Sequence, residues 1–118
     1  MVWSSGLNAH VELVKKHRIM DRLTAQRIRE NPALLDIPRE NIRRWIRLEI
    51  EQSESKQPST YNLLWQKILD ILPTEKILEI LESNDPKLER LQHCAPFAGV
   101  LSQDEVMAIY NGHEPVPA

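Results

Sequence analysis

The chain has 118 residues, of which 42% are hydrophobic and 27% are charged, and its formal net charge is −2. This length suits one domain with a modest core, so we expect a single helical domain over residues 1–118. No apolar run approaches the roughly 20 residues that span a bilayer, and the N-terminus lacks the basic and apolar pattern of a signal peptide. We therefore expect a cytoplasmic protein that does not enter a membrane. Cys94 is the only cysteine, which excludes an intramolecular disulfide.

Helical spacing dominates the sequence, and no segment alternates apolar and polar residues in the manner of a strand. The pattern predicts an all-α fold, an irregular bundle of about six or seven helices with a long first helix and no sheet. The first helix is predicted from Asn8 to Glu30, with an apolar stripe that includes Val14, Leu23 and Ile28. Such a helix is long for a chain of this size, so we expect part of its apolar stripe to extend beyond the core. A homodimer would cover that exposed part of the stripe.

The second stretch of helix begins after a proline. Asn31 and Pro32 predict a short turn, since asparagine suits a helix cap and proline suits the first helical position. Pro38 is then predicted to open a longer helix. Its apolar face, predicted to be buried, consists of Ile42, Trp45, Ile46 and Ile50.

Residues 52–60 carry no apolar side chain except a proline and are predicted to form a polar linker. The linker divides the charge of the chain. Residues 1–51 hold ten Lys and Arg against seven Asp and Glu, whereas residues 52–118 hold five against ten. This asymmetry indicates either a basic face for nucleic acid beside an acidic half for a protein, or two halves that attract each other within or between chains.

After the linker, the clearest amphipathic pattern in the chain predicts a helix centred on Trp65. Its predicted inner face consists of Tyr61, Leu64, Trp65, Ile68, Leu69 and Leu72. Three short helices follow, beginning at Pro73, at Asp85 and at Ser102.

The start of the last helix carries two signals within six residues. Ser102 and Glu105 have the spacing of a capping box, in which each side chain accepts a hydrogen bond from the other residue's backbone N–H. Leu101 and Val106 have the spacing of a hydrophobic staple across the same turn. Phe97 is the only large apolar residue in the turn before this helix, and it is predicted to fill the core.

A row of arginines on the helix after Pro38 offers a nucleic-acid hypothesis. The candidate phosphate-contacting residues are Arg39, Arg43, Arg44 and Arg47. The segment loosely resembles the recognition helix of a helix-turn-helix protein, although the usual glycine-containing turn before it is missing. Glu40 and Glu51 stand at i, i+4 from Arg44 and Arg47, which is typical of a solvated helix surface. A DNA-binding regulator is therefore the alternative interpretation.

No catalytic or metal-binding residue is assigned from the sequence. His10 and His17 are seven positions apart, about 10.5 Å along a helix, which is too far for easy convergence on one metal. His93 and Cys94 are adjacent, so on a helix their side chains point about 100° apart and cannot pair. No glycine-rich phosphate loop, zinc-protease helix or G-x-S-x-G motif is present, and we expect no cofactor. A nuclease or other hydrolase built from scattered histidines and carboxylates remains a distant alternative.

Trp3 differs from the other aromatic residues because it is predicted to precede any helix. An exposed tryptophan is a frequent anchor in protein interfaces, so Trp3 is the candidate partner-binding residue.

The segment Pro96–Ser102, which reads P-F-A-G-V-L-S, resembles the ending of a group of short uncharacterised bacterial helical proteins. Those proteins also carry an N-I-x-x-W segment, here Asn41–Trp45, a stretch like His17–Ile19 and a central tryptophan helix, here around Trp65. The resemblance implies a small bacterial protein of the size of antitoxins and brings no activity with it. We therefore interpret the chain as a non-catalytic protein–protein interaction module, antitoxin-like, with an unidentified protein partner.

Overall fold

The computed structural model describes the backbone of residues 2–112 and the side chains of residues 11–112. Within that range it contains six α-helices, two 3-10 turns and no strand, which confirms the all-α prediction. The elements are α1 (Val2–Glu30), η1 (Pro32–Leu35), α2 (Asp36–Gln52), α3 (Thr60–Ile71), α4 (Thr74–Glu82), η2 (Pro86–Leu88), α5 (Glu89–His93) and α6 (Gln103–Tyr110).

The long first helix is confirmed, but its predicted start was six residues too late. α1 begins at Val2 because the first residues contain no proline, and extending an existing helix is far easier than nucleating a new one. The backbone of Trp3 is therefore part of α1 and does not precede it. The side chain of Trp3 lies outside the described residues.

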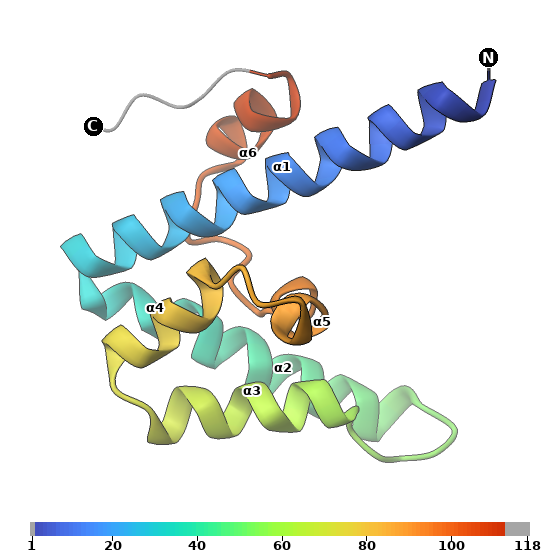
Figure 1. Cartoon of the computed structure of the whole chain (residues 1–118). Helices are drawn as coiled ribbons and strands as arrows, with labels where there is room; N and C mark the ends of the chain where they lie inside the picture. The colour runs from blue at the N-terminus through green and yellow to red at the C-terminus, as the bar shows by residue number, and fades with distance from the viewer. Residues whose placement is uncertain (1, 113–118) are drawn as a thin grey trace.

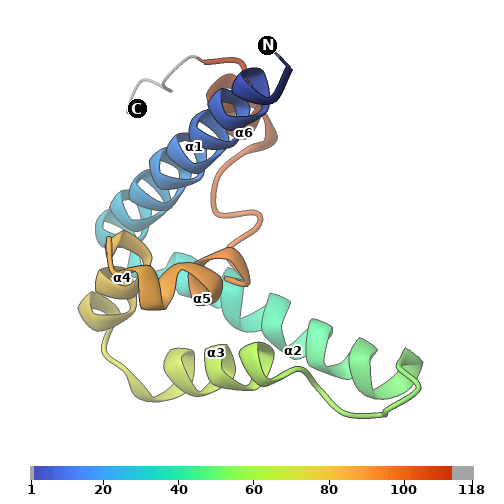
Figure 2. The ribbon, with the colours of Figure 1, turned by 45° about the vertical axis from the view of Figure 1, so that its right-hand side comes forward.

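The helices form two layers with short helices between them (Figures 1 and 2). α2 and α3 pack against each other as a hairpin, and α1 crosses the molecule on the other side with α6 against it. α4 and α5 lie between the layers. The polar segment predicted as a linker joins α2 to α3, and the Glu49 carboxylate holds it by accepting hydrogen bonds from the Ser59 backbone N–H (3.0 Å) and the Asn62 side chain.

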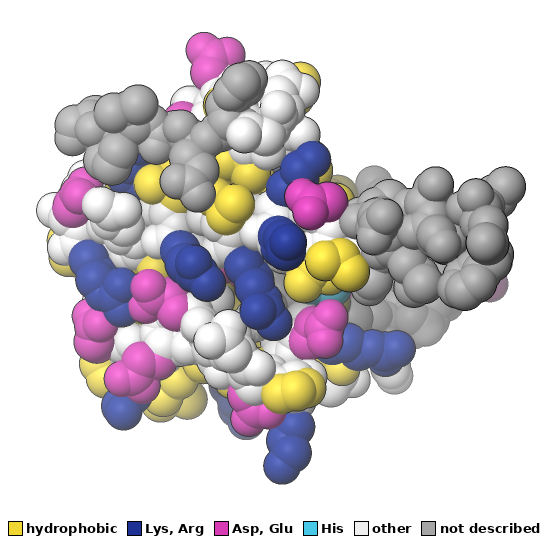
Figure 3. Space-filling view, turned by 45° about the horizontal axis from the view of Figure 1, so that its top comes forward, with side chains coloured by type: hydrophobic (Ala, Val, Ile, Leu, Met, Phe, Trp, Pro, Cys, Tyr) yellow, Lys and Arg dark blue, Asp and Glu magenta, His cyan; other side chains and the backbone are white. Residues whose placement is uncertain are grey.

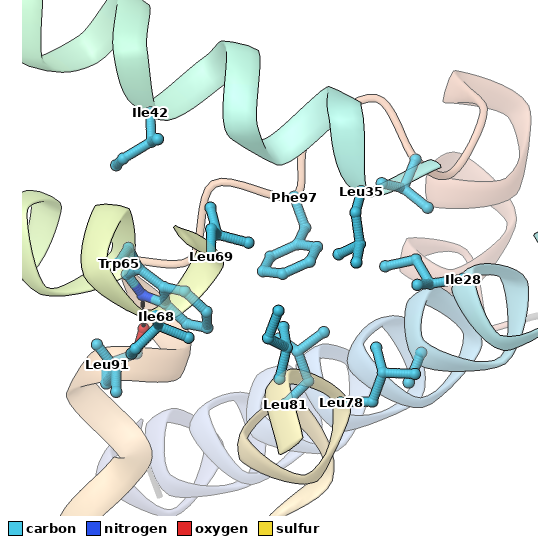
Figure 4. Packing of buried hydrophobic residues seen from close by; sticks show 13 residues of the cluster. Ile28, Leu35, Ile42, Trp65, Ile68, Leu69, Leu78, Leu81, Leu91 and Phe97 are labelled. Atoms are coloured by element: carbon cyan, nitrogen blue, oxygen red, sulfur yellow. Dashed lines mark hydrogen bonds between the residues drawn. The ribbon is translucent and has the colours of Figure 1, made fainter. Parts of the chain in front are cut away.

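The larger of two apolar cores lies where α2, α3, α4, α5 and the last turns of α1 meet (Figure 4). The Trp65 ring meets Phe97 edge-on, with 5.4 Å between ring centroids, and its indole N–H donates to the Leu91 carbonyl at 2.8 Å. Trp65 and Phe97 are thus core residues, as predicted. Ile50 and Leu64 were predicted to be buried but are 44% and 42% exposed, because each lies on a helix face that is wider than the core beneath it.

The smaller core lies between α1 and α6. Leu23, Leu101 and Ile109 are buried there, and Val106 packs against them, as the hydrophobic staple predicts. The capping box at Ser102 is complete, with the Ser102 hydroxyl accepting from the Glu105 N–H and the Glu105 carboxylate accepting from the Ser102 N–H, both at 3.1 Å. The staple and the box together fix the angle at which α6 meets α1.

Ion pairs join the basic first half of the chain to the acidic second half. On α1, Arg29 pairs with Glu75 (2.8 Å) and Glu82 (2.5 Å) of α4, and Arg27 pairs with Glu105 of α6 at 2.6 Å. Basic and acidic side chains accordingly lie side by side over the face that α1 presents in Figure 3. The charge asymmetry seen in the sequence therefore serves contacts within the chain.

Candidate binding cleft

A cleft of about 400 Å³ opens between α1, α5 and the segment that connects α5 to α6. It lies between the two cores, since Phe97 of the larger core and Leu101 of the smaller core both line it. Its apolar lining consists of Met20, Ala95, Phe97, Ala98, Leu101 and Val106. Its polar lining side chains are His17, Asp21, Thr24, Gln92 and His93. Apolar walls with a few convergent polar groups are typical of ligand-binding sites.

α1 supplies three of the polar groups from one of its faces. His17, Asp21 and Thr24 stand at i, i+4 and i+7, and residues at this spacing lie above one another on a helix. The two cores flank this face, because Leu23, Ala25 and Ile28 are buried close by. The same packing that buries the last half of α1 thus directs its polar stripe into the cleft.

The last residue of α5 brings a second histidine to the cleft. The rings of His17 and His93 meet nearly at right angles, with 5.4 Å between their centroids. Burial, and secondly the charge of His93, lower the pKa of His17 below its usual value. His17 is therefore a neutral imidazole at neutral pH, able to donate one hydrogen bond and accept another.

Asp21 is the one formally charged side chain among the described residues that line this cleft. Burial raises the pKa of its carboxyl group to about 7. No hydrogen bond or ion pair joins the Asp21 carboxylate to another side chain in the described range 11–112. A partly buried ionisable group in a cleft, with a pKa shifted by desolvation, is a candidate functional residue.

Gln92 is held in one orientation by the end of α4. Its side-chain amide nitrogen donates to the carbonyl oxygens of Ile80 (2.9 Å) and Ser83 (2.7 Å). With the nitrogen committed, the amide oxygen is the group of Gln92 that remains to accept a hydrogen bond. Gln92 lines the cleft together with Asp21 and has this one acceptor to offer.

A buried residue of α2 shapes the opposite wall. The side-chain nitrogen of Asn41 donates to the carbonyl oxygens of Pro96 (2.9 Å) and Ala98 (2.8 Å). Gly99 follows in the left-handed region, with φ of +100°, which favours glycine. The N-I-x-x-W and P-F-A-G-V-L-S segments, noted separately in the sequence, are thus in direct contact.

A second hollow, of about 500 Å³, lies beside η2 and α5. It is lined by Tyr61, Pro86, Lys87, Glu89, Arg90 and His93, most of which are exposed and polar. A ligand there would bury little apolar surface, and apolar burial is the main source of binding free energy. The cleft between the two cores is therefore the better candidate.

The arginines of the nucleic-acid hypothesis lie on α2, and three of them have partners on or near their own helix. Arg39 bonds Asp36 and the Leu69 carbonyl, Arg43 pairs with Glu40, and Arg44 donates to the Asn41 side chain, at 3.3 to 3.7 Å. Arg47 is exposed. The pairing predicted between Glu40 and Arg44 is replaced by one between Glu40 and Arg43, because at i, i+3 these side chains are equally close neighbours on a helix.

Catalysis or metal binding by the two histidines would need a hydrogen-bonded nucleophile or further ligands beside them. Among residues 11–112, no hydrogen bond joins either imidazole to a hydroxyl or thiol group, and no three side chains are placed to ligate a metal together. Cys94 is half-buried and is not part of the cleft lining.

No family model, curated protein or solved structure matches the chain. None of the helices in the described part of the chain has the length and apolar character that a membrane crossing requires.

Sequence reasoning missed the cleft, although one signal was present. His17 and Asp21 stand at i, i+4 on the predicted first helix, so their shared face could have been recognised. His93 is 76 positions further along the chain, and only the packing of α5 brings it to His17.

Proposed function

We propose that this chain is a non-catalytic protein–protein interaction module that receives part of a partner protein in the cleft between α1 and α5. The observation that carries the proposal is the combination of apolar walls with the unpaired carboxylate of Asp21. A partner side chain seated there would bury apolar surface and also satisfy a group that is now partly desolvated.

The surface next to the cleft supports a contact larger than one side chain. Val106 of α6 lines the cleft, and Met107 and Tyr110 on the same helix are 50% and 41% exposed. Stable protein interfaces cover about 800 Å² on each partner, which the cleft alone does not provide. The exposed apolar side chains of α6 would extend the contact around its edge.

An antitoxin-like role in a bacterial cytoplasm is the specific form of this function that we propose. The chain would hold a toxic partner enzyme inactive by occupying its surface, which requires tight binding and no chemistry of its own. The small size and net charge of −2 suit a partner with a basic surface.

We also propose that the chain forms a homodimer through the first half of α1. Over its 29 residues α1 is about 43 Å long, close to the longest dimension of the molecule at 44 Å. Val11 and Leu13 in that half are exposed. Light scattering should give twice the monomer mass at submillimolar concentration, and a strict monomer would contradict this assembly.

The partner proposal is tested by co-expressing the chain with the product of the adjacent gene and purifying them together. Met107→Glu should weaken the complex at least tenfold, because it places a charge in the proposed interface. The matched control is Ile71→Glu, at a 69% exposed position on α3 away from the cleft, which should leave affinity within about twofold. Equal weakening by both variants, or no complex at all, would count against the proposal.

A further inference from the structure

Two of the polar side chains that line the cleft offer acceptor oxygens, and Thr24 adds a hydroxyl that can donate or accept. The Asp21 carboxylate and the Gln92 amide oxygen are acceptors only, and no lysine or arginine is among the described residues that line the cleft. His17 is neutral at neutral pH and so offers a single N–H. A ligand that donates several hydrogen bonds and carries positive charge would satisfy the Asp21 and Gln92 oxygens.

The apolar walls define the rest of the ligand. Met20 and Phe97 line the cleft together with Asp21, so an occupant needs an apolar stem behind its charged head. Arginine and lysine side chains have this construction, and arginine binds a carboxylate through two parallel N–H···O bonds. The planar guanidinium also stacks on aromatic rings, which His17, His93 and Phe97 supply here.

We propose that the cleft is an arginine-binding site, in which a guanidinium from the partner protein pairs with Asp21 beside His17 and His93 while its stem lies against Met20 and Phe97. This inference rests on the proposed function, because it takes the cleft as the docking site of a partner. It adds the chemical identity of the anchoring residue.

Two arginines of the chain itself are the rival occupants. Arg18 and Arg22 neighbour Asp21 on α1 and line smaller hollows that share Asp21 with the cleft. Both are exposed, and neither forms an ion pair with a described residue. Neither arginine is among the residues that line the cleft, so among the described residues the cleft itself holds no cation beside Asp21.

The site predicts a defined pH dependence. The Asp21 carboxyl group is half protonated near pH 7, and only its ionised form attracts a guanidinium. Affinity should therefore fall up to tenfold for each pH unit below about 7 and level off above it. The other titratable and charged groups around Asp21 are His17, Arg18, Arg22, Glu82, Asp85, Glu89 and His93. Protonation of His17 would weaken cation binding in the same direction.

The test uses the whole chain and small probes. n-Butylguanidinium represents the arginine side chain, and n-butylurea is its neutral counterpart of the same shape. Titrations followed by amide NMR at pH 8 should show saturable shifts around the cleft for n-butylguanidinium and at least tenfold weaker binding of n-butylurea. Equal binding of the two probes, or shifts centred on another surface, would overturn the proposal.

Variants assign the effect to the carboxylate. Asp21→Asn should weaken n-butylguanidinium binding at least tenfold and remove its pH dependence, whereas Asp70→Asn, an exposed aspartate of α3, should leave both unchanged within twofold. Arg18→Ala should leave the affinity within twofold. A tenfold gain from Arg18→Ala would show that Arg18 already fills the site, which would overturn the inference.

The partner complex separates this inference from the proposed function. If n-butylguanidinium fails to bind while Met107→Glu still disrupts a complex with the neighbouring gene's product, the arginine-binding site is contradicted and the proposed interaction module is supported. If n-butylguanidinium binds as expected and no such complex forms, the guanidinium site is supported and the proposed partner interaction is contradicted.

Discussion

The two apolar cores of this protein are built differently. The larger core draws residues from α1, α2, α3, α4 and α5, and its largest members, Trp65 and Phe97, contact each other directly. Among the described residues, the smaller core has three buried members, supplied by α1, α6 and the segment that leads into α6. The larger core therefore resembles the centre of an ordinary globular domain, whereas the smaller core is a seam between two helices.

The candidate cleft lies at the boundary between these cores. Packing there is complete enough to keep Asp21 partly out of water, yet open enough to leave about 400 Å³ unfilled. A site that binds a ligand needs both properties, because a filled core has no room and an open surface does not strengthen electrostatic contacts. The division into two cores is what makes this arrangement available in so short a chain.

The strongest test of the comparison removes a large side chain from each core. Trp65→Ala should lower the free energy of unfolding by about 3 to 5 kcal/mol, through the cavity and the lost hydrogen bond to Leu91. Ile109→Ala in the smaller core should lower it by about 2 kcal/mol, the low end for such a change, because fewer neighbours surround it. Urea denaturation followed by circular dichroism measures both. An equal or larger loss for Ile109→Ala would contradict the proposed ranking of the cores.

The wall between the cores is tested through Asn41. Asn41→Ala leaves the carbonyl oxygens of Pro96 and Ala98 without their donor and should lower the free energy of unfolding by about 2 to 3 kcal/mol. Amide exchange at Gly99 should also become faster. The exposed Asn84 provides the control, since Asn84→Ala should change neither quantity measurably.

The smaller core depends on the start of α6, which Glu105 holds in two ways. Glu105→Ala removes the return bond of the capping box and the ion pair with Arg27, and should lower the free energy of unfolding by about 1 to 2 kcal/mol at pH 7. The neighbouring Asp104→Ala serves as the control with a smaller effect.

The same variant has a predicted pH dependence. The Ser102 backbone N–H, and after it Arg27, hold the pKa of Glu105 below its usual value of 4.5. The stabilisation is therefore present above about pH 4.5 and is lost as the pH falls and the carboxylate becomes protonated. Thermal melts of wild type and Glu105→Ala should converge at low pH, and a constant difference down to pH 2 would contradict the assignment.

The contribution of Asp21 to stability should have the opposite pH dependence. Its pKa rises from 3.8 to about 7 on folding, so the folded state binds more protons between these values and stability falls as the pH increases from about 4 to 7. Asp21→Asn should consequently stabilise the protein by about 1 to 2 kcal/mol at pH 8 and have little effect near pH 4. Denaturation at the two pH values measures this. A loss of stability at pH 8 would mean that the carboxylate has a structural role.

The smallest effect is expected for the surface arginines of α2, which lie outside both cores. Replacing Arg39, Arg43 and Arg47 together by alanine should change the free energy of unfolding by about 0.5 kcal/mol or less, because exposed ion pairs contribute little. Arg44 is left in place because it contacts Asn41. If these residues contact DNA, the variant would lose submicromolar DNA binding at physiological salt. The slope of log affinity against log salt concentration would also become shallower by about 0.9 for each lost phosphate contact.

Local signals in the sequence predicted the helices well where backbone hydrogen bonds decide the outcome. The capping box at Ser102, the turn at Pro32 and the helix start at Pro73 depend on residues within four positions of each other. Even here the detail differed at Asn31, whose side chain makes no capping bond although the turn forms, because proline at the next position is already preorganised for a helix.

The sequence by itself determined the all-α fold, the order of the helices and most of the residues that face a core, because each follows from spacing along a single helix. Which faces meet was decided only by tertiary packing. Asn41 reaches Ala98 across 57 positions, and His93 reaches His17 across 76, and no periodicity encodes either contact. The cleft exists because the packing of the two cores leaves a space unfilled between α1, α5 and the segment after α5. Its polar groups acquire their properties from that burial, which no local pattern specifies.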